Sequence, residues 1–406
     1  MAKEKCINEF RERVKNEVLK DILPFWMSNT VDNKNGGFYG AITNDLNVIE
    51  DSQKALVICA RILWTYSFAF GQYKNSEYLK MAERAYNYLI ANFWDEHYSG
   101  AYWMLDCEGK PLDTKKQIYA EAFAIYGLSE YYMAFKSVPA LEKAIELFEL
   151  IERYGYDKQN KGYFEAYTRE WTLMTDFRLL KDDLNEKKTM NTHLHILEAY
   201  TNLLRAWDNE LLRSRLRELI EIMLEHIIDS NTYHFKLYFD EQWNSKSKRI
   251  SFGHDIEGSW LLNEAAEMLG DKELIAKVKD VSVKMAQAVY DEGIKPDGGL
   301  IYEFESEKCI DSDRCWWVMA EAVVGFYNAY QISGEEHFFR ASFDAWNFIE
   351  TYIIDRKCGE WFRRVSEDLK PYQNMLKVDE WKCPYHNSRA CFEIIKRLRL
   401  AEEIKK

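Results

Sequence analysis

The chain has 406 residues, of which 47% are hydrophobic and 30% are charged, so it holds enough apolar material for a large buried core. Its formal net charge of −13 opposes binding to nucleic acid or an anionic membrane, because both need clustered lysine and arginine. The first ten residues have no apolar signal-peptide core, and no stretch approaches the roughly 18 apolar residues of a membrane span. The eight cysteines are scattered without Cys-x-x-Cys spacing, as in reduced cytosolic proteins. We therefore expect a cytoplasmic protein without nucleic-acid or membrane partners.

One three-part unit recurs along the whole chain: an amphipathic helix, a short hairpin rich in glycine and aromatic residues, and a helix that is apolar on nearly all sides. The amphipathic helices are predicted at residues 4–26, 76–94, 140–154, 210–228, 272–290 and 335–353. The hairpins are predicted at residues 36–40, 100–103, 162–164, 233–235, 298–302 and 359–362. The apolar helices are predicted to begin near Gln53, Gln117, Met190, Gly253, Arg314 and Tyr385, at steps of 61 to 73 residues.

A helix that is apolar on all sides must be covered on all sides, whereas an amphipathic helix needs cover on one stripe only. Both needs are met when the six apolar helices close into an inner ring and the six amphipathic helices surround it. The sequence therefore predicts an all-α protein with an (α/α)6 barrel and short β-hairpins at one rim. No linker rich in serine, glycine or proline interrupts the repeat, which favours a single domain over residues 1–406.

The histidines point to the end of the ring at which the inner helices begin. Four of the eight histidines, His193, His195, His254 and His386, lie in or beside these helix openings. One histidine alone is most simply a hydrogen-bonded core residue, but three that converge from distant repeats favour a functional site. For His193 the structural role stays the preferred interpretation.

Helical spacing indicates which polar side chains share a face with these histidines. Residues three or four apart are neighbours on a helix, so Asn191, His195 and Glu198 share one face, and His254 and Glu257 share another. Glu257 is therefore a candidate for holding the His254 ring in one tautomer. Its replacement by glutamine is then expected to lower turnover more than substrate affinity.

Other chemistries remain open at this point. His195, His254, His386 and Glu257 suit zinc, but no HExxH-type spacing supports a metal, so we expect none. No Gly-x-Gly-x-x-Gly motif or P-loop is present, and we expect no cofactor. A glycosidase or a non-enzymatic carbohydrate-binding barrel is the alternative, with carboxylates at Glu121, Asp183, Glu257 and Glu321. Glu121 and Glu321 are equally explained as buried ion-pair or capping groups.

Four longer motifs resemble those of a known family. They are residues 189–203 around His195, residues 253–257 with Trp260, Trp316-Trp317 with Glu321, and the Trp381-Lys-Cys-Pro-Tyr-His386 segment. In order and spacing they are similar to the N-acylglucosamine 2-epimerase superfamily, and most closely to its cellobiose 2-epimerase type. This resemblance covers nearly the whole chain and independently implies the (α/α)6 barrel.

The resemblance also implies roles for individual residues. His254 and His386 match the acid/base pair, and His195 matches a third histidine that assists at the reducing end of the sugar. The remaining matches are substrate-binding or orienting positions, with Trp317 and Trp381 as aromatic walls, and they are Arg61, Tyr119, Asn191, Glu257, Trp317, Trp381, Glu321, Trp260 and Asp183.

The reaction implied by the resemblance is epimerisation at carbon 2 of the reducing-end aldose of a β-1,4-linked disaccharide. Imidazole, with a pKa near 6.5, removes and returns the carbon-2 proton, and an enediolate between the two steps is stabilised by Arg61 and His195. An aldose–ketose isomerase or an N-acylglucosamine 2-epimerase remains the alternative on the same scaffold. The expected partner is a small-molecule sugar, and the expected oligomeric state is a monomer or a weak homodimer.

Overall fold

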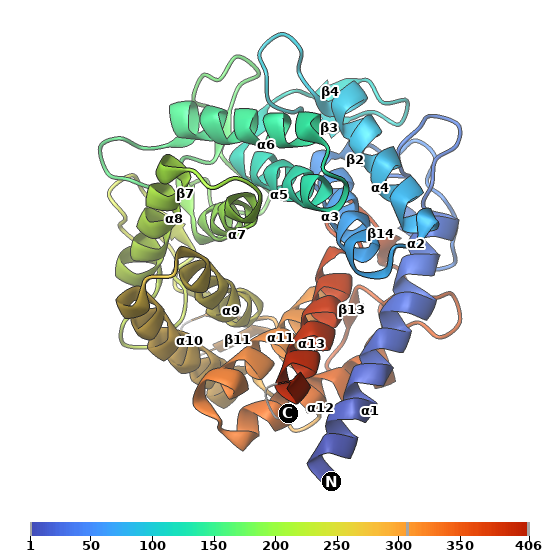
Figure 1. The fold of residues 1–406 in the computed structure, drawn as a ribbon, viewed down its shortest axis with the longest axis vertical. Coiled ribbons are helices and arrows are strands. Elements are labelled where there is room, and N and C mark those ends of the chain that lie inside the picture. Colours follow the sequence, from blue (N-terminus) through green and yellow to red (C-terminus); the bar gives the residue numbers. More distant parts are fainter. Residues whose placement is uncertain (1, 306–307, 404–406) are drawn as a thin grey trace.

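Two concentric rings of helices make up the molecule (Figure 1). The computed structural model describes residues 2–305 and 308–403. Each inner helix packs against the next, and the last closes against the first. Each also begins within three residues of its predicted start, so the prediction of an (α/α)6 barrel is confirmed. The inner helices are α3 (Leu56–Tyr73), α5 (Ile118–Phe135), α7 (Met190–Ala206), α9 (Phe252–Leu269), α11 (Trp316–Ser333) and α13 (Tyr385–Glu403).

The outer ring is built from the amphipathic segments. Helix α4 shows the principle, because it buries Tyr78, Met81 and Ala85 while Glu83 and Asn87 on its other side stay exposed. The outer helices are α1 (Ala2–Glu17) continuing into α2 (Leu23–Asn29), α4 (Ser76–Tyr88), α6 (Val138–Leu150), α8 (Glu210–Ile222), α10 (Lys272–Gly293) and α12 (Glu336–Phe348). Among the described residues, no helix has both the length and the apolar character that crossing a bilayer requires.

Single π-helical turns, which the sequence did not predict, accompany five of the outer helices. One of them joins α1 to α2, and the others extend the C-terminal ends of α4, α6, α8 and α12. They span Val18–Ile22, Leu89–Phe93, Ile151–Gly155, Met223–Ile227 and Ile349–Ile353.

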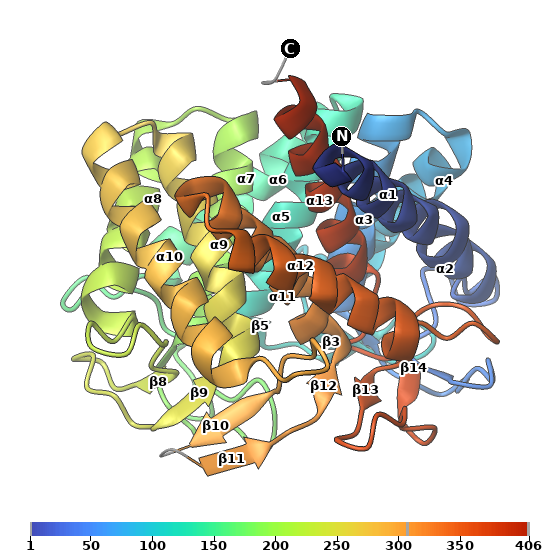
Figure 2. The same cartoon turned by 90° about the horizontal axis from the view of Figure 1, so that it is seen from below.

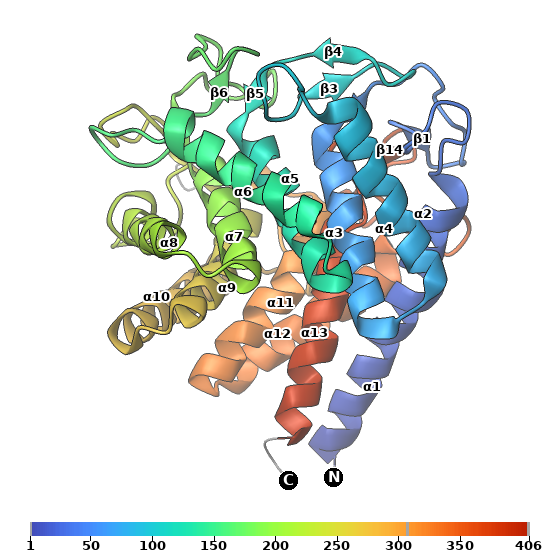
Figure 3. The same ribbon diagram turned by 45° about the horizontal axis from the view of Figure 1, so that its top comes forward.

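Short strands gather at one end of the barrel, opposite the two chain termini (Figures 2 and 3). The strand before each inner helix pairs antiparallel with a strand from the next repeat, and the pair of β1 with β14 joins the first repeat to the last. Each predicted hairpin range forms a single antiparallel bridge at this rim, such as Trp94 with Ala101, whereas the strands that link neighbouring repeats lie outside the predicted ranges. The strands are β1 (Ile42–Thr43), β2 (Lys54–Ala55), β3 (Met104–Leu105), β4 (Pro111–Asp113), β5 (Lys116–Gln117), β6 (Ala166–Tyr167), β7 (Lys188–Thr189), β8 (Tyr238–Phe239), β9 (Arg249–Ser251), β10 (Glu303–Glu305), β11 (Lys308–Asp311), β12 (Arg314–Cys315), β13 (Arg364–Val365) and β14 (Leu376–Val378).

A repeated ion pair fastens this rim. In five repeats, an aspartate that follows the outer helix accepts a hydrogen bond from a lysine or arginine in the strand that precedes the next inner helix. In the first of these pairs, Lys54 Nζ lies 2.7 Å from Asp32 Oδ2, and both side chains are buried. These pairs hold the helix openings in place, and they are Asp32–Lys54, Asp95–Lys116, Asp157–Lys188, Asp297–Arg314 and Asp355–Lys377.

Candidate active site

A cavity of about 540 Å³ opens at the strand-bearing end of the barrel. Every inner helix contributes a polar or aromatic side chain to its wall, because each helix begins at this end. These side chains are Arg61 from α3, Tyr119 from α5, His195 from α7, His254 from α9, Trp317 from α11 and His386 from α13. The structure therefore brings residues from six distant segments into one site.

The other predicted site residues fall into two groups. Asp183, Asn191, Glu257 and Trp381 also line the cavity. Trp260 and Glu321 lie behind its wall, where the indole nitrogen of Trp260 donates to Glu321 Oε2 at 3.0 Å.

Each of the three lining histidines is held through its Nδ1 atom. Nδ1 of His195 lies 2.9 Å from Glu198 Oε2, and Nδ1 of His386 lies 2.7 Å from Glu321 Oε1. Nδ1 of His254 has a neutral partner, the Ser251 hydroxyl, at 2.7 Å. These contacts fix the ring orientations and leave Nε2 of each histidine for contact with a substrate.

The structure corrects the predicted partner of His254. Glu257 does not contact this ring; its Oε1 accepts a hydrogen bond from Arg389 and lies 3.9 Å from Nδ1 of His386. A buried carboxylate is stabilised far better by a guanidinium than by a neutral imidazole, so Glu257 turns across the barrel to α13. Ser251, at the N-terminal end of α9, takes the predicted orienting role.

Arg389 is a central residue that the sequence analysis did not identify. It is 1% exposed, and its guanidinium donates to Glu198, Glu257 and Glu321. The sequence feature that could have identified it is its position in α13, because it lies three residues after His386 and therefore on the same helix face. The inner helices supply the three carboxylates that compensate its charge.

Burial controls the protonation of the histidines. It lowers the pKa of His254 to about 3, with a further contribution from neighbouring His195. Burial also lowers the pKa of His195, although Glu198 opposes this, and it holds the pKa of His386 well below its ordinary value, assisted by Arg61 and Arg389. All three imidazoles are therefore neutral near pH 7.

Arg61 is a buried cation whose contacts are not carboxylates. Its Nη2 donates to the Tyr119 hydroxyl at 2.9 Å, its Nη1 donates to the carbonyl oxygen of Trp381 at 3.4 Å, and its guanidinium lies 4.1 Å from the ring centre of Phe123. Within the described part of the chain it forms no ion pair. A cation without a compensating carboxylate in a buried wall is suited to stabilise negative charge that develops on a substrate.

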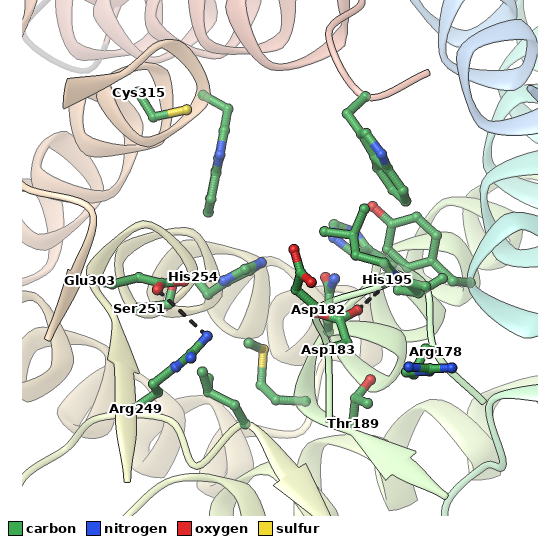
Figure 4. Close-up of a pocket in the computed structure, with 18 of the residues that line it drawn as sticks. Arg178, Asp182, Asp183, Thr189, His195, Arg249, Ser251, His254, Glu303 and Cys315 are labelled. Atoms are coloured by element: carbon green, nitrogen blue, oxygen red, sulfur yellow. Dashed lines mark hydrogen bonds and ion pairs between the residues drawn. The ribbon is translucent and has the colours of Figure 1, made fainter. Parts of the chain in front are cut away.

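A long loop between β6 and β7 covers part of the cavity. Residues 177–184 contribute to its wall, and in the view of Figure 4 the side chains of Asp182 and Asp183 lie between His254 and His195. The Tyr238 hydroxyl donates to Asp183 Oδ1 at 3.0 Å, which ties the loop to β8. Of this segment, only Asp183 was predicted from the sequence. The sequence feature that could have indicated this loop is the spacing between successive inner helices, which is longest, at 73 residues, from Gln117 to Met190.

Two other candidates have structural roles. Nε2 of His193 accepts the backbone N–H of Tyr163 at 2.9 Å, in agreement with the preferred interpretation for this residue. The carboxylate of Glu121 accepts the backbone N–H of Ala101 at 3.0 Å. Each side chain thus accepts a backbone hydrogen bond from a hairpin that lies next to its own inner helix. Neither side chain lines the cavity.

Among the described residues, one cluster of side chains has a geometry that could hold a metal ion. Glu257, Glu321 and His386 offer ligand atoms within 4.8 Å of one another. However, Nη2 of Arg389 already donates to both carboxylates, so a guanidinium supplies the positive charge that a metal ion would bring. This donor set therefore fits an arginine-centred cluster better than a metal site.

The fold and the site together define a class of protein: a helical barrel with a histidine-lined, sugar-sized cavity at one end. The N-acylglucosamine 2-epimerase (GlcNAc 2-epimerase) family model matches residues 37–390. The cellobiose 2-epimerase of Bacteroides fragilis is 47% identical over 386 residues, which cover 95% of this chain and 98% of that protein. The chain belongs to the N-acylglucosamine 2-epimerase family.

Solved structures agree with this assignment. The structure of a cellobiose 2-epimerase from Bacillus thermoamylovorans has a TM-score of 0.92 and 39% identity, and the match covers 96% of this chain and 100% of that one. A D-mannose isomerase structure has a TM-score of 0.84 at 21% identity, covering 95% of this chain and 98% of that one, and so shares the fold. The predicted family is confirmed, and the protein is a sugar epimerase, an enzyme of the isomerase class.

Proposed function

We propose that this enzyme is a cellobiose 2-epimerase. It inverts carbon 2 of the reducing-end aldose of β-1,4-linked disaccharides and so converts cellobiose to glucosyl-mannose and lactose to epilactose. The observation that supports this most strongly is the convergence of three oriented histidines and one unpaired arginine on a single cavity. Relatives of the same name at up to 47% identity over nearly the whole chain support the choice of substrate.

The mechanism needs one base and one acid at carbon 2. His254 and His386 both line the cavity, and the Trp317 ring lies beside both, with centroid distances of 4.8 Å and 5.5 Å. On the open-chain sugar, one of the two histidines removes the carbon-2 proton, and the other protonates the opposite face. General acid–base catalysis of this kind contributes about 10²- to 10⁴-fold in rate.

The enediolate formed between these steps carries negative charge on its oxygens. Arg61 is the best placed donor for that charge, because its guanidinium is buried and has no carboxylate partner in the described part of the chain. His195, held by Glu198 and packed edge-on to Tyr119 at 5.1 Å between ring centres, assists from the neighbouring wall. A fixed donor in a water-poor site stabilises charge without reorganisation.

The same enediolate offers two related reactions. Protonation at carbon 1 gives a ketose, so aldose–ketose isomerase activity is the first alternative. The second is action on an N-acylglucosamine. A glycosidase is disfavoured because Glu257 and Glu321 are held together by Arg389 and Glu121 by a backbone amide, so they do not flank a glycosidic bond as an acid/base pair.

The test is product analysis after incubation with cellobiose, lactose, mannose and N-acetylglucosamine in deuterated water. Deuterium at carbon 2 of glucosyl-mannose or epilactose is the expected result. A labelled ketose as the main product would identify an isomerase, and free monosaccharides from the disaccharides would identify a glycosidase. His254→Ala and His386→Ala are expected to abolish turnover with unchanged circular dichroism, and substantial activity in either variant would refute the two-histidine scheme.

A further inference from the structure

Arg389 joins three inner helices to α13. Its Nη1 donates to Glu198 of α7, and its Nη2 donates to Glu257 of α9 and to Glu321 of α11, the last at 2.7 Å. All four side chains are at least nine-tenths buried. A single guanidinium therefore connects carboxylates from three separate repeats.

Two of these carboxylates each hold a histidine of the site. Glu198 holds His195 at 2.9 Å, and Glu321 holds His386 at 2.7 Å. A continuous chain of contacts thus runs from one histidine through Arg389 to the other. Displacement of the guanidinium would displace both rings.

The position of the guanidinium is itself constrained. Its central carbon lies 4.3 Å from the ring centre of Tyr385 and 4.8 Å from that of Trp260. The Tyr385 hydroxyl donates to Glu198, so this ring is fixed as well. A lysine ammonium is a point charge without the planar fork, and it cannot hold the three carboxylates in the same geometry.

The single positive charge of Arg389 does not balance the charges of the three carboxylates around it. Three buried carboxylates share one guanidinium, and burial of an uncompensated carboxylate is costly, so the cluster retains a proton. Among the described residues, Glu257 Oε2 has no hydrogen-bond partner, so the retained proton is placed on the Glu257–Glu321 pair. Burial raises the pKa of Glu257, with a contribution from Glu321, and burial also raises that of Glu321. In contrast, Arg389 and His195 outweigh the effect of burial on Glu198 and hold its pKa at about 2.

We propose that Arg389 is a positioning residue that fixes both histidine–carboxylate pairs and keeps one shared proton on Glu257 and Glu321, next to Nδ1 of His386. This proposal rests on the proposed epimerase function for its catalytic meaning. When Nε2 of His386 gives its proton to the substrate carbon, Nδ1 takes the shared proton from Glu321. The imidazole remains neutral throughout, and the carboxylate charge that is left faces Arg389. In the reverse direction both protons return along the same path.

Every inner helix contributes charged or titratable groups around this path, and the proton balance depends on all of them. They are Arg61 from α3, Tyr119 from α5, His195 and Glu198 from α7, His254 and Glu257 from α9, Glu321 from α11, and Tyr385, His386 and Arg389 from α13.

The first experiment is ¹⁵N NMR of histidine-labelled enzyme without substrate near pH 7, with His386 assigned through its glutamine variant. The expected result is a neutral ring with the proton on Nε2 and with Nδ1 as acceptor. A ring that carries its proton on Nδ1, donated to a Glu321 carboxylate, would overturn the relay. This readout does not depend on activity, so it decides the proposal even if cellobiose proves not to be a substrate.

The second experiment compares Arg389→Lys with Arg314→Lys in NMR and kinetics. Arg314 is also buried and paired, but the equivalent position in four other repeats is lysine, so this control is expected to keep full activity. Because a displacement of about 1 Å at a reacting group can cost about 100-fold, Arg389→Lys is expected to lower kcat by about that factor. KM is expected to stay within about threefold, because the lost interaction acts on the transition state. His386 should then lose its single tautomer, whereas a kcat within twofold of the parent enzyme would refute the positioning role.

Glu321→Gln covers the case in which Arg389→Lys does not fold. The glutamine side chain has no acidic proton to transfer to Nδ1 of His386. We expect a kcat at least tenfold lower with unchanged circular dichroism. Full turnover in this variant would contradict the relay.

Discussion

The acidic side of the pH profile of kcat/KM tests the electrostatics of the site most directly. A histidine with the ordinary pKa near 6.5 is about 76% neutral at pH 7 and only about 3% neutral at pH 5, so a base of that kind would lose about 25-fold of its rate over this range. In this site burial lowers the pKa of His254 to about 3, so the ring stays almost fully neutral at pH 5. The expected change in kcat/KM over this range is therefore less than about twofold.

The protein itself must remain folded at pH 5 for this comparison. Arg389 and His195 outweigh burial and hold the pKa of Glu198 at about 2, below its value in the unfolded chain. A depressed pKa stabilises the fold above the unfolded value, and this stabilisation is lost only as the pH falls through about 2, so it is largely retained at pH 5. Intrinsic tryptophan fluorescence at each pH is the control. A fully folded enzyme whose kcat/KM falls with a midpoint between pH 6 and pH 7 would refute the argument that burial keeps the base neutral.

Three further changes probe individual contacts. Ser251→Ala removes the hydroxyl that lies 2.7 Å from Nδ1 of His254, and it is expected to lower kcat about tenfold with KM unchanged. Ser251→Thr keeps the hydroxyl and is expected to retain activity. Equal kcat in the two variants would assign Ser251 to packing. Lys54→Met leaves buried Asp32 without its cation and is expected to lower the free energy of unfolding by about 3–5 kcal/mol in urea titration. Lys54→Arg is the matched control, and a loss below about 1 kcal/mol in the methionine variant would show that the rim tolerates the unpaired aspartate. Incubation with a chelator is expected to leave the epimerisation rate unchanged, because Arg389 occupies the carboxylate cluster, and loss of activity that Zn²⁺ restores would contradict this.

The helices of this protein were predictable because each carries a dense pattern that recurs in every repeat. The strands were not, because a pair such as β5 with β6 has two residues on each side, too few to carry an alternating pattern or to specify a register. Their location at one rim followed from the glycine and aromatic motifs between helices. The pairing between successive repeats required the structure.

Inside the site, too, contacts between different repeats could not be predicted from the sequence pattern. The contact of His195 with Glu198 was predictable because both residues lie on one helix, three positions apart. The contacts of His386 with Glu321 and of Glu257 with Arg389 cross the barrel, so they depend on how the inner helices are rotated about their axes. Periodicity determines which residues share a face of a helix, but it does not determine which face of the next helix they meet. For this reason Glu257 was paired with the wrong histidine and Arg389 was missed.

Two buried arginines with opposite surroundings explain how one site combines rigidity with reactivity. Arg389 is surrounded by three carboxylates, so its charge is already compensated and further negative charge gains little from it. Arg61 contacts a hydroxyl, a carbonyl oxygen and aromatic rings, so its charge is not compensated by any of these partners. The charge of an enediolate therefore interacts more strongly with Arg61 than with Arg389, although both are cations of the same kind. The arrangement assigns Arg389 to holding the histidines and leaves Arg61 to respond to the charge that forms during the reaction.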